Sequence, residues 1–428
     1  MTWRAAVYMA LVAVVSGFAP GVAAQDTTAT TSSRRQHWGV AVGVNPSSAI
    51  VMDTYQRKYQ QGRGNLSWGV EALYSSVPAD SDAYAADYGY PTIGVGVKYS
   101  LNHGVTMHRS PDPAWGLARE VDYRSRMGNS LAVYGTFARP LYRRHRWEVD
   151  YTFNFGVGYS RTKYDKDDNV DNELIGSRWL IFFGAGLHVA YQVAPAWGVK
   201  AGVEYWHLSN GALNRPNKGA NFIGPSLALV YRPYYDAVSG SEAQTVAQKV
   251  RKPFHRYWLA RVTAGVGAKT LNEDWQLTQF QTEPDSPDYR TGRFRLYAAY
   301  SLQADVLYRY ARRWASGIGA DLFYGTYADR VADIDPQFGG DGTASPWSFG
   351  IAAKHEVYYH RLRLAMSLGV YLYRSMGANA KEVEQPYYER IGIHYDIPRT
   401  RWAVGVNVKA HRTKADLTEV VVSYQIER

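Results

Sequence analysis

Cysteine is absent from the 428-residue chain. Its absence excludes disulfide bonds, thiolate metal sites and cysteine nucleophiles. Long hydrophobic runs are also scarce, because the most apolar stretch after the N-terminus, residues 180–197, is interrupted by His188, Gln192 and Pro195. No later segment is therefore expected to cross a membrane as a helix. The chain also lacks a glycine-rich phosphate loop, and its net charge of +10 is not gathered into a basic stripe, so nucleic-acid binding is not expected.

Aromatic residues and glycine are, in contrast, abundant. The chain contains 35 Tyr, 13 Trp, 13 Phe and 39 Gly. Few soluble enzymes combine so much tyrosine with so much glycine. Together with the strand patterns described below, this composition is typical of a β-barrel whose outer wall meets lipid.

The N-terminus predicts export. Arg4 precedes an apolar run at residues 5–18, and small residues follow at 21–24. This is the pattern of a secretory signal peptide with cleavage after Ala24, and the run is too short for a membrane span. Residues 1–24 are therefore predicted as the signal peptide and residues 25–35, rich in Thr and Ser, as a mobile leader. An exported chain without cysteine or membrane helices fits an integral protein of the Gram-negative outer membrane.

Long stretches of the chain alternate strictly between apolar and polar side chains. In residues 147–160 every odd position is Trp, Val, Tyr or Phe, and every even position is polar or glycine. Residues 294–310 and 362–372 follow a similar pattern. Such alternation places every second side chain in lipid and the others in a barrel lumen. A soluble periplasmic β-sandwich is the alternative, but it seldom alternates over a dozen residues with aromatic residues at both ends.

The chain also repeats itself. Residues 196–207 resemble residues 401–411, and each segment is followed by one more strand pattern. We therefore predict an all-β, transmembrane antiparallel β-barrel fold made of a duplicated eight-strand unit, with a first half at 36–235, a linker at 236–255 and a second half at 256–428. The halves could form two small barrels or one. The size that membrane barrels commonly reach favours one barrel of about sixteen strands.

His207 and Ser209 are the first candidates for chemistry. They are two residues apart on a predicted strand, so they share a face, and a histidine within reach of a serine can take the hydroxyl proton and create a nucleophile. Both continue the apolar, lipid-facing row of residues 197–205. The turn before this strand, residues 194–196, is short and therefore periplasmic, so the pair is expected at the level of the outer leaflet. An isolated His-x-Ser pair is, however, more often an ordinary pair of interfacial polar residues.

A resemblance to a known family favours the catalytic interpretation. The segment His207-Leu208-Ser209-Asn210, the turn Pro216-Asn217-Lys218-Gly219 and the strand after it resemble the lipid A 3-O-deacylase (PagL), or acyloxyacyl hydrolase-like, family of outer-membrane barrels. The resemblance covers about residues 37–235. It implies that Ser209 is the nucleophile and His207 the general base. It also implies that Asn210, with nearby backbone N–H groups, forms the oxyanion hole, and Asn217 belongs to the same loop.

The chain departs from the family pattern at two positions. Asn221 stands where the family has the glutamate that orients the histidine, and Ala212 stands where the family has a glycine. An amide can hold the imidazole by accepting from Nδ1–H, but it cannot stabilise the imidazolium as a carboxylate does. Asn221 is therefore expected to orient His207 and to give slower or differently tuned chemistry.

The second half is expected to lack catalytic chemistry. His411 occupies a place in the repeat similar to that of His207, but the strand alternation puts His411 in the lumen, and no Ser-Asn or Pro-Asn-x-Gly follows it. Three other polar clusters are expected to be solvated: the acidic loop at residues 165–173, and the arginine pairs at 143–144 and 312–313.

The His207/Ser209 pair on the lipid-facing row predicts an outer-membrane serine esterase. The resemblance implies that it removes an ester-linked acyl chain from lipid A, as a lipid A 3-O-deacylase does, and so modifies lipopolysaccharide. Its partners would be lipopolysaccharide and outer-membrane lipids, and no metal or cofactor is implied. The alternative is a non-enzymatic outer-membrane channel or adhesin with a decayed motif. A wide lumen lined by Arg295, Gln303, Asp305 and Arg309 would favour a channel.

Overall fold

A computed structural model describes residues 37–109, 124–233, 253–412 and 414–427. The predicted signal peptide at 1–24, the leader at 25–35 and most of the linker at 236–255 lie outside the described residues.

Each half of the chain closes into its own antiparallel eight-stranded barrel. In the first barrel, the first strand pairs with both the second and the last. Its strands are β1 (Trp38–Ile50), β2 (Gly64–Ser75), β3 (Thr92–Gly104), β6 (Ser130–Arg144), β7 (Trp147–Ser160), β8 (Trp179–Ala194), β9 (Trp197–Ser209) and β10 (Ala220–Tyr231).

The second barrel repeats this arrangement, because its first strand pairs with its second and its last. Its strands are β11 (Tyr257–Lys269), β12 (Tyr297–Ala311), β13 (Trp314–Gly325), β14 (Ala344–Tyr359), β15 (Leu362–Met376), β16 (Tyr387–Asp396), β17 (Trp402–His411) and β18 (Lys414–Glu427). Short elements lie in the connections, namely α3 (Thr54–Arg57), α4 (Ala83–Asp87), β4 (Thr106–Met107), β5 (Ser125–Arg126), α7 (Asn272–Phe280), α8 (Ala328–Ile334), η3 (Asp335–Phe338) and α9 (Gly377–Val383), together with η1 (Pro78–Asp80).

The structure confirms the all-β barrel fold and decides how the two halves are arranged. The single sixteen-stranded barrel that the sequence favoured is wrong, and the alternative of two small barrels is correct. The physical reason is strand closure: β10 hydrogen-bonds to β1 and β18 to β11, so neither half has a free strand edge that could pair with the other.

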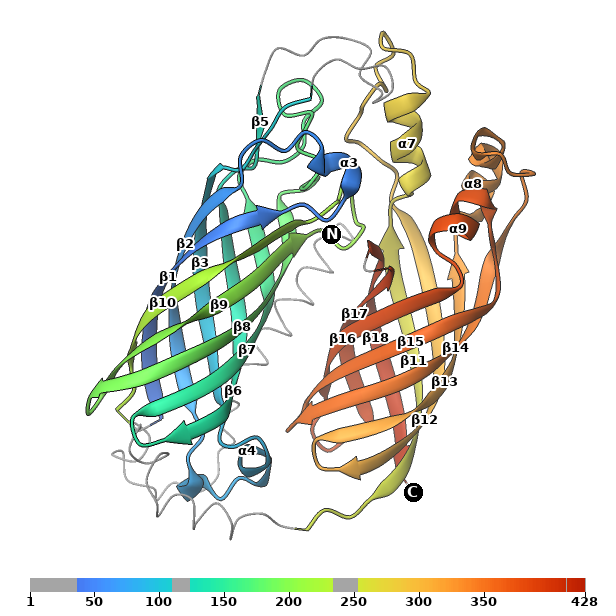
Figure 1. Cartoon of the computed structure of the whole chain (residues 1–428). Helices are drawn as coiled ribbons and strands as arrows, with labels where there is room; N and C mark the ends of the chain where they lie inside the picture. Colours follow the sequence, from blue (N-terminus) through green and yellow to red (C-terminus); the bar gives the residue numbers. More distant parts are fainter. Residues whose placement is uncertain (1–36, 110–123, 234–252, 413, 428) are drawn as a thin grey trace.

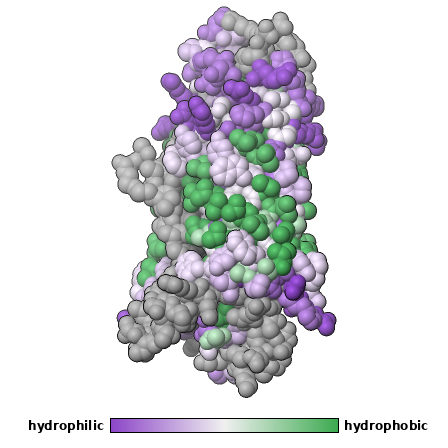
Figure 2. Space-filling view, turned by 90° about the vertical axis from the view of Figure 1, so that its left-hand side faces the viewer, coloured by the Kyte–Doolittle hydropathy of each residue, from purple (hydrophilic) through white to green (hydrophobic). Residues whose placement is uncertain are grey.

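The outer walls carry the apolar side chains that the alternation predicted. On β1, Val40, Val42 and Val44 are 44 %, 53 % and 46 % exposed, whereas the intervening side chains face the lumen. Figure 2 shows a hydrophobic belt on one face of the molecule, below a hydrophilic end. Among the described residues, no helix has the length and hydropathy needed to cross a bilayer.

Both lumens are filled with packed and ion-paired side chains. In the first barrel, Lys98 pairs with Glu204 at 2.9 Å, and Trp206 stacks on Phe222 with ring centroids 3.9 Å apart. In the second, Lys354 Nζ lies 3.2 Å from Asp305 and 2.8 Å from Asp321.

The lumen of the second barrel is narrow where Gln303 and Asp305 lie. A cavity beside Lys354 and Gln303 measures about 20 Å³, which is room for one or two water molecules. Gln303 and Asp305 therefore do not line the wide, conducting lumen that the channel alternative required, and Arg295 lies exposed before the start of β12.

The two barrels lie side by side, with their long connections at the upper end in Figure 1. Membrane barrels have short turns on the periplasmic side and longer loops outside, so we name this upper end the outer end. The barrels touch at both ends. At the outer end, Val157, Ile181 and Leu213 of the first barrel form one apolar cluster with Ala268 and Val406 of the second.

Helix α4 and its neighbours make the contact at the periplasmic end. Arg312 Nε donates to Asp87 at 3.1 Å, Arg313 donates to the Asp87 carbonyl at 2.7 Å, and Tyr88 OH donates to the Tyr358 carbonyl at 2.8 Å. The expectation that the arginines at 312–313 are simply solvated is therefore wrong. They join the barrels because the turn between β12 and β13 places them against the loop of α4.

Candidate active site

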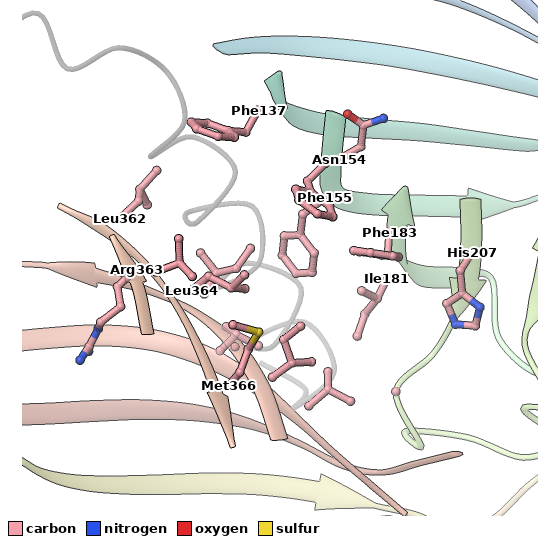
Figure 3. A pocket seen from close by; sticks show the side chains of 18 of the residues that line it. Phe137, Asn154, Phe155, Ile181, Phe183, His207, Leu362, Arg363, Leu364 and Met366 are labelled. Atoms are coloured by element: carbon pink, nitrogen blue, oxygen red, sulfur yellow. The ribbon is translucent and has the colours of Figure 1, made fainter. Parts of the chain in front are cut away.

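The end of β9 places His207 and Ser209 on the outer wall, in the row that starts with the exposed Trp197. His207 pairs across the sheet with Phe183 of β8 and with Asn221 of β10. Ser209 is 8 % exposed, and His207 is half-buried. Both side chains line a cavity on the side of the first barrel that faces the second, and Figure 3 shows His207 at this cavity.

A hydrogen-bond network fixes the tautomer of His207. Asn221 Nδ2 donates to the Ile50 carbonyl at 3.3 Å, and a carbonyl can only accept, so the Asn221 oxygen must point toward the imidazole. This oxygen lies 2.7 Å from His207 Nδ1 and accepts from Tyr205 OH at 2.7 Å. His207 therefore carries its proton on Nδ1, and the lone pair of Nε2 is available as a base.

Ser209 is near this base but is not bonded to it. The described residues contain no hydrogen bond between Ser209 and His207, although both line the same cavity. Catalytic hydrogen bonds are often long in the absence of substrate and tighten only when it binds. The structure thus brings the three predicted residues together: Ser209 and His207 line one cavity, and Asn221 contacts the imidazole.

The loop after Ser209 is held together by asparagine side chains. The Asn210 N–H donates to Asn217 Oδ1 at 2.9 Å, and Asn210 Nδ2 donates to the Asn214 carbonyl at 3.1 Å. Asn214 Nδ2 in turn donates to the Gly176 carbonyl at 2.6 Å. Asn210 is fully buried, so Asn210 and Asn217 brace the loop from inside.

Two left-handed residues follow Asn210 in this loop. Gly211 has φ +62° and Ala212 has φ +70°. The left-handed conformation costs a residue with a Cβ about 1 kcal/mol or more, which is why a glycine is the expected residue where this chain has Ala212. Within the described structure, the N–H groups of Gly211 and Ala212 have no hydrogen-bond acceptor. Gly211 lines the cavity together with Ser209.

The second barrel binds the carbonyl groups of the same two residues. Thr418 Oγ1 of β18 donates to the Gly211 carbonyl at 2.7 Å. Thr270, which follows β11, donates to the Ala212 carbonyl from its N–H at 2.9 Å and from its Oγ1 at 3.0 Å. Sequence reasoning missed both threonines, because they lie in the half without the motif and no local pattern distinguishes them.

Gly219 of the Pro-Asn-x-Gly turn packs directly against His207. Its φ is +76°, and a Cβ at this position would lie 2.6 Å from His207 Cε1, closer than side chains approach one another. The turn therefore needs glycine both for its backbone conformation and to leave room for the imidazole.

Gly219→Ala is expected to lower activity by up to about a hundredfold, because a displacement of the base of about 1 Å can have that effect. Gly339→Ala is the matched control: Gly339 has φ +80°, but nothing lies within 4 Å of its Cβ position. The control carries the same backbone strain without the clash. Equal activity of the two variants would contradict the packing argument.

The acidic loop contributes two buried carboxylates beside the turn. Asp171 and Glu173 are 2 % and 1 % exposed, and Arg109 Nε lies 3.2 Å from Asp171. The expectation of a solvated loop is therefore wrong for these two residues. They are buried because the connections of the first barrel fold over its outer end and pair with Arg109.

Lys218 joins this acidic cluster to the turn. Its Nζ lies 2.8 Å from Glu173 and 3.0 Å from Asp53. Burial alone would raise the pKa of the Asp53 carboxyl, but Lys218 and the Gln56 N–H outweigh it and lower that pKa below its ordinary value. The Lys218–Asp53 ion pair therefore fastens the turn to the loop of α3.

His411 lies inside the second barrel, as the alternation predicted. It is 4 % exposed, and its Nε2 is 2.8 Å from Tyr371 OH. Glu384, His411 and Asp416 are close enough to share a metal ion. Asp416 is, however, already paired with both Lys269 and Lys409, so this cluster is a lumenal ion network.

The cavity beside Ser209 lies between the two barrels and measures about 2710 Å³. Figure 3 shows its two walls: Phe155, Ile181, Phe183 and His207 come from the first barrel, whereas Leu364 and Met366 come from the second.

Comparison with known families assigns both halves of the chain. Residues 91–230 match the family described as lipid A 3-O-deacylase (PagL). This match makes most of the first barrel similar to the lipid A 3-O-deacylase family. Residues 258–428 match the family described as acyloxyacyl hydrolase, C-terminal domain. The resemblance inferred from the motif is confirmed. The chain is an integral outer-membrane protein with the domains of a lipid A deacylase-like enzyme.

Similarity to individual proteins is low. No curated protein matches the sequence. The solved structure of the outer-membrane enzyme PagL is 14 % identical, covers 45 % of this chain and 98 % of its own, and has a TM-score of 0.27. Neisserial surface protein A is 10 % identical, with coverages of 46 % and 96 % and a TM-score of 0.29. A mutant porin of Rhodopseudomonas blastica is 7 % identical, with coverages of 91 % and 99 % and a TM-score of 0.16.

Proposed function

We propose that the protein is a serine esterase that hydrolyses an ester-linked acyl chain of lipid A in the outer leaflet. The observation that carries the proposal is the 2.7 Å contact between His207 Nδ1 and Asn221 Oδ1. It leaves His207 Nε2 as a base on the same face of β9 as Ser209, beside a membrane-level cavity. The families of both halves support lipid A as the substrate.

The reaction follows from the roles of these groups. His207 Nε2 takes the proton of Ser209 Oγ, and the oxygen attacks the ester carbonyl. The N–H of Gly211 donates to the oxyanion that forms, while Asn210 and Asn217 hold the loop that carries this N–H. His207 then returns the proton to the leaving hydroxyl group of lipid A. A water molecule, activated by the same histidine, hydrolyses the acyl–Ser209 ester and releases the fatty acid.

Two esters of lipid A are candidates for cleavage. The family of the first half indicates the ester at the 3-O position of the sugar, whereas the family of the second half indicates an acyloxyacyl ester, in which one fatty acid is bound to the hydroxyl group of another. We propose the 3-O ester, because the proposed catalytic residues lie in the first half.

Mass spectrometry of lipid A from cells with and without the protein tests the proposal. Expression is expected to lower the mass of lipid A by one hydroxyacyl chain. Loss of an unsubstituted fatty acid would instead indicate the acyloxyacyl ester. An unchanged spectrum, with folded protein present in the outer membrane, would overturn the enzymatic function.

The role of the Asn221 amide in orienting His207 can be tested by substitution. Asn221→Glu is expected to raise activity or leave it unchanged, because it restores the carboxylate of the family beside the imidazole. Asn221→Leu is expected to lower activity about tenfold through loss of one hydrogen bond of about 1.4 kcal/mol. Rates of fatty-acid release at matched protein levels measure both. A folded Asn221→Glu variant without activity would show that the site uses Asn221 in another way.

A further inference from the structure

The cavity between the barrels is too large and too apolar to be empty. Its volume of about 2710 Å³ equals about ninety water molecules at about 30 Å³ each, whereas apolar cavities that stay dry in proteins measure on the order of 150 Å³. At mid-height the walls are hydrocarbon and aromatic side chains, among them Phe153, Phe155 and Phe183 on one side and Met366, Ile391 and Ile393 on the other. In a bilayer, the material that fills such a space is acyl chains.

The cavity is bounded where the barrels meet. At the outer end, Thr418 and Thr270 are bonded to the loop after Ser209. At the periplasmic end, His360 Nε2 lies 2.7 Å from Asp82, and Tyr88 OH donates to the Tyr358 carbonyl. The space between these contacts is therefore a fixed part of the molecule, with the proposed nucleophile at its outer end.

Polar groups at the outer end specify which lipid fits. Arg215 and Lys218 of the first barrel and Arg412 and Lys414 of the second all line the cavity. Arg412 and Lys414 are exposed, so they can meet an anionic head group, and arginine binds phosphate through two parallel N–H donors.

Glu389 adds an acceptor to the same wall. It lies on β16 and lines the cavity, and its Oε2 is buried without a hydrogen-bond partner in the described part of the chain. A buried carboxylate oxygen needs a donor. A sugar hydroxyl or an amide N–H beside the acyl chains would supply one, and a lipid of hydrocarbon and phosphate alone would not.

We propose that this inter-barrel cavity is the binding site for the substrate glycolipid: its acyl chains lie between the two barrels, and its phosphates lie against Arg412 and Lys414 at the outer end. The inference rests on the proposed lipid A deacylase function. Under this proposal, the second barrel forms half of the acyl-chain binding site and takes no part in the chemical reaction.

Filling the cavity from the second barrel tests this proposal. Ile393→Trp places a large side chain in the cavity, and Ile318→Trp makes the same change on β13, at a position that is 71 % exposed and does not line the cavity. The purified full chain is assayed in detergent with lipid A and with p-nitrophenyl butyrate, an uncharged ester whose acyl chain is too short to reach from Ser209 to the mid-height walls of the cavity. Ile393→Trp is expected to lower kcat/KM for lipid A about tenfold or more and to leave butyrate hydrolysis unchanged, whereas Ile318→Trp changes neither.

The outcomes separate this proposal from the proposed function. If the wild-type protein hydrolyses butyrate but not lipid A, the lipid A function fails. If the wild-type protein hydrolyses lipid A and Ile393→Trp does so equally well, the cavity is not the acyl site. If Ile393→Trp loses both activities while it remains heat-modifiable on gels, the wall acts on catalysis and the proposal is again wrong. Met366→Phe serves as the second variant if Ile393→Trp does not fold.

Phosphate binding by the cations is tested with the double variant that combines Arg412→Gln with Lys414→Gln. This variant is expected to lose about tenfold in kcat/KM for bisphosphorylated lipid A, with a weaker dependence on salt, and to keep its activity on butyrate. Dephosphorylated lipid A is expected to be hydrolysed equally by the variant and the wild-type protein. An unchanged rate with bisphosphorylated lipid A would overturn the assignment of the phosphate site.

An independent observation carries a second inference. The carbonyls of Gly211 and Ala212 are bonded to Thr418 and Thr270, which restrains the backbone directly after the Gly211 N–H and offsets the cost of the left-handed Ala212. The geometry points to Thr270 and Thr418 as positioning residues that keep the Gly211 N–H in place for the oxyanion. A positioned donor acts mainly in the transition state, so its loss lowers kcat and not substrate binding.

Thr418→Val is therefore expected to lower kcat for p-nitrophenyl butyrate about tenfold at unchanged KM, and Thr418→Ser, which keeps the hydroxyl, is expected to restore it. Thr263→Val is the control, because Thr263 is buried on β11 away from the site. An unchanged kcat for Thr418→Val would overturn the inference. A rise in KM at constant kcat would do the same, because it would assign Thr418 to substrate binding.

Discussion

Ser209→Ala is expected to abolish the release of fatty acid from lipid A while both barrels stay intact. The hydroxyl is the proposed nucleophile, and losing a nucleophile that acts with a base lowers kcat by about a thousandfold or more. The change should not disturb folding, because the Ser209 side chain makes no hydrogen bond in the described structure and alanine fits the same space. Lipid A mass spectra and fatty-acid release, at matched levels of heat-modifiable protein, measure the effect.

The matched control for this variant is Ser226→Ala. Ser226 lies on β10 in the same barrel, and within the described chain its buried hydroxyl also lacks a hydrogen-bond partner. The same atom is removed from a position that does not line the cavity. Wild-type activity of Ser209→Ala would refute the serine mechanism, whereas loss of activity in both variants would point to a general effect of the substitution on the barrel.

His207→Ala is expected to lower deacylation by a factor of about a hundred to ten thousand, the usual contribution of a general base. His411→Ala is expected to affect stability at most, because His411 is enclosed in the second lumen against Tyr371. The two histidines occupy similar places in the repeat but opposite faces of their strands. Deacylation is measured for both variants at matched outer-membrane levels.

The pair of variants also tests whether catalysis is confined to the first barrel. If His411→Ala were as damaging as His207→Ala in protein that stays heat-modifiable, the second barrel would take part in catalysis. In the double variant with Ser209→Ala, loss of His207 is expected to add little, because a nucleophile and its base act as one unit and their effects do not add.

Much of the site could be predicted because its signals are local. The strand alternation places His207 and Ser209 on the outer wall, since side chains of a strand point to opposite faces with a period of two. The connection from β9 to β10 joins neighbouring antiparallel strands, and their register places Asn221 opposite His207. The motif residues Asn217 and Gly219 proved to contact Asn210 and His207, although their individual tasks could not be deduced from spacing.

Other features depend on contacts between distant segments. Residues 165–173 and 312–313 are charged and polar, and their sequence does not show that Asp171 and Glu173 would meet Arg109, or that Arg312 would meet Asp87. The partner in each case comes from another connection or from the other barrel. From sequence alone, a charged segment is therefore expected to be solvated, because its ion-pair partner lies in a distant segment.

By itself, the sequence determined the fold class, the lipid-facing rows, the lumenal place of His411 and the resemblance of the first half to lipid A 3-O-deacylases, because alternation and motif spacing are properties of neighbouring residues. Only the tertiary structure decided that each half closes on itself, that Thr270 and Thr418 hold the loop after Ser209, and that a cavity of about 2710 Å³ lies between the barrels. Closure depends on which strand edges pair across 150 residues or more, and the cavity depends on how two finished barrels dock. Neither the closure of each barrel nor the cavity between them follows from the alternation of side chains along a strand.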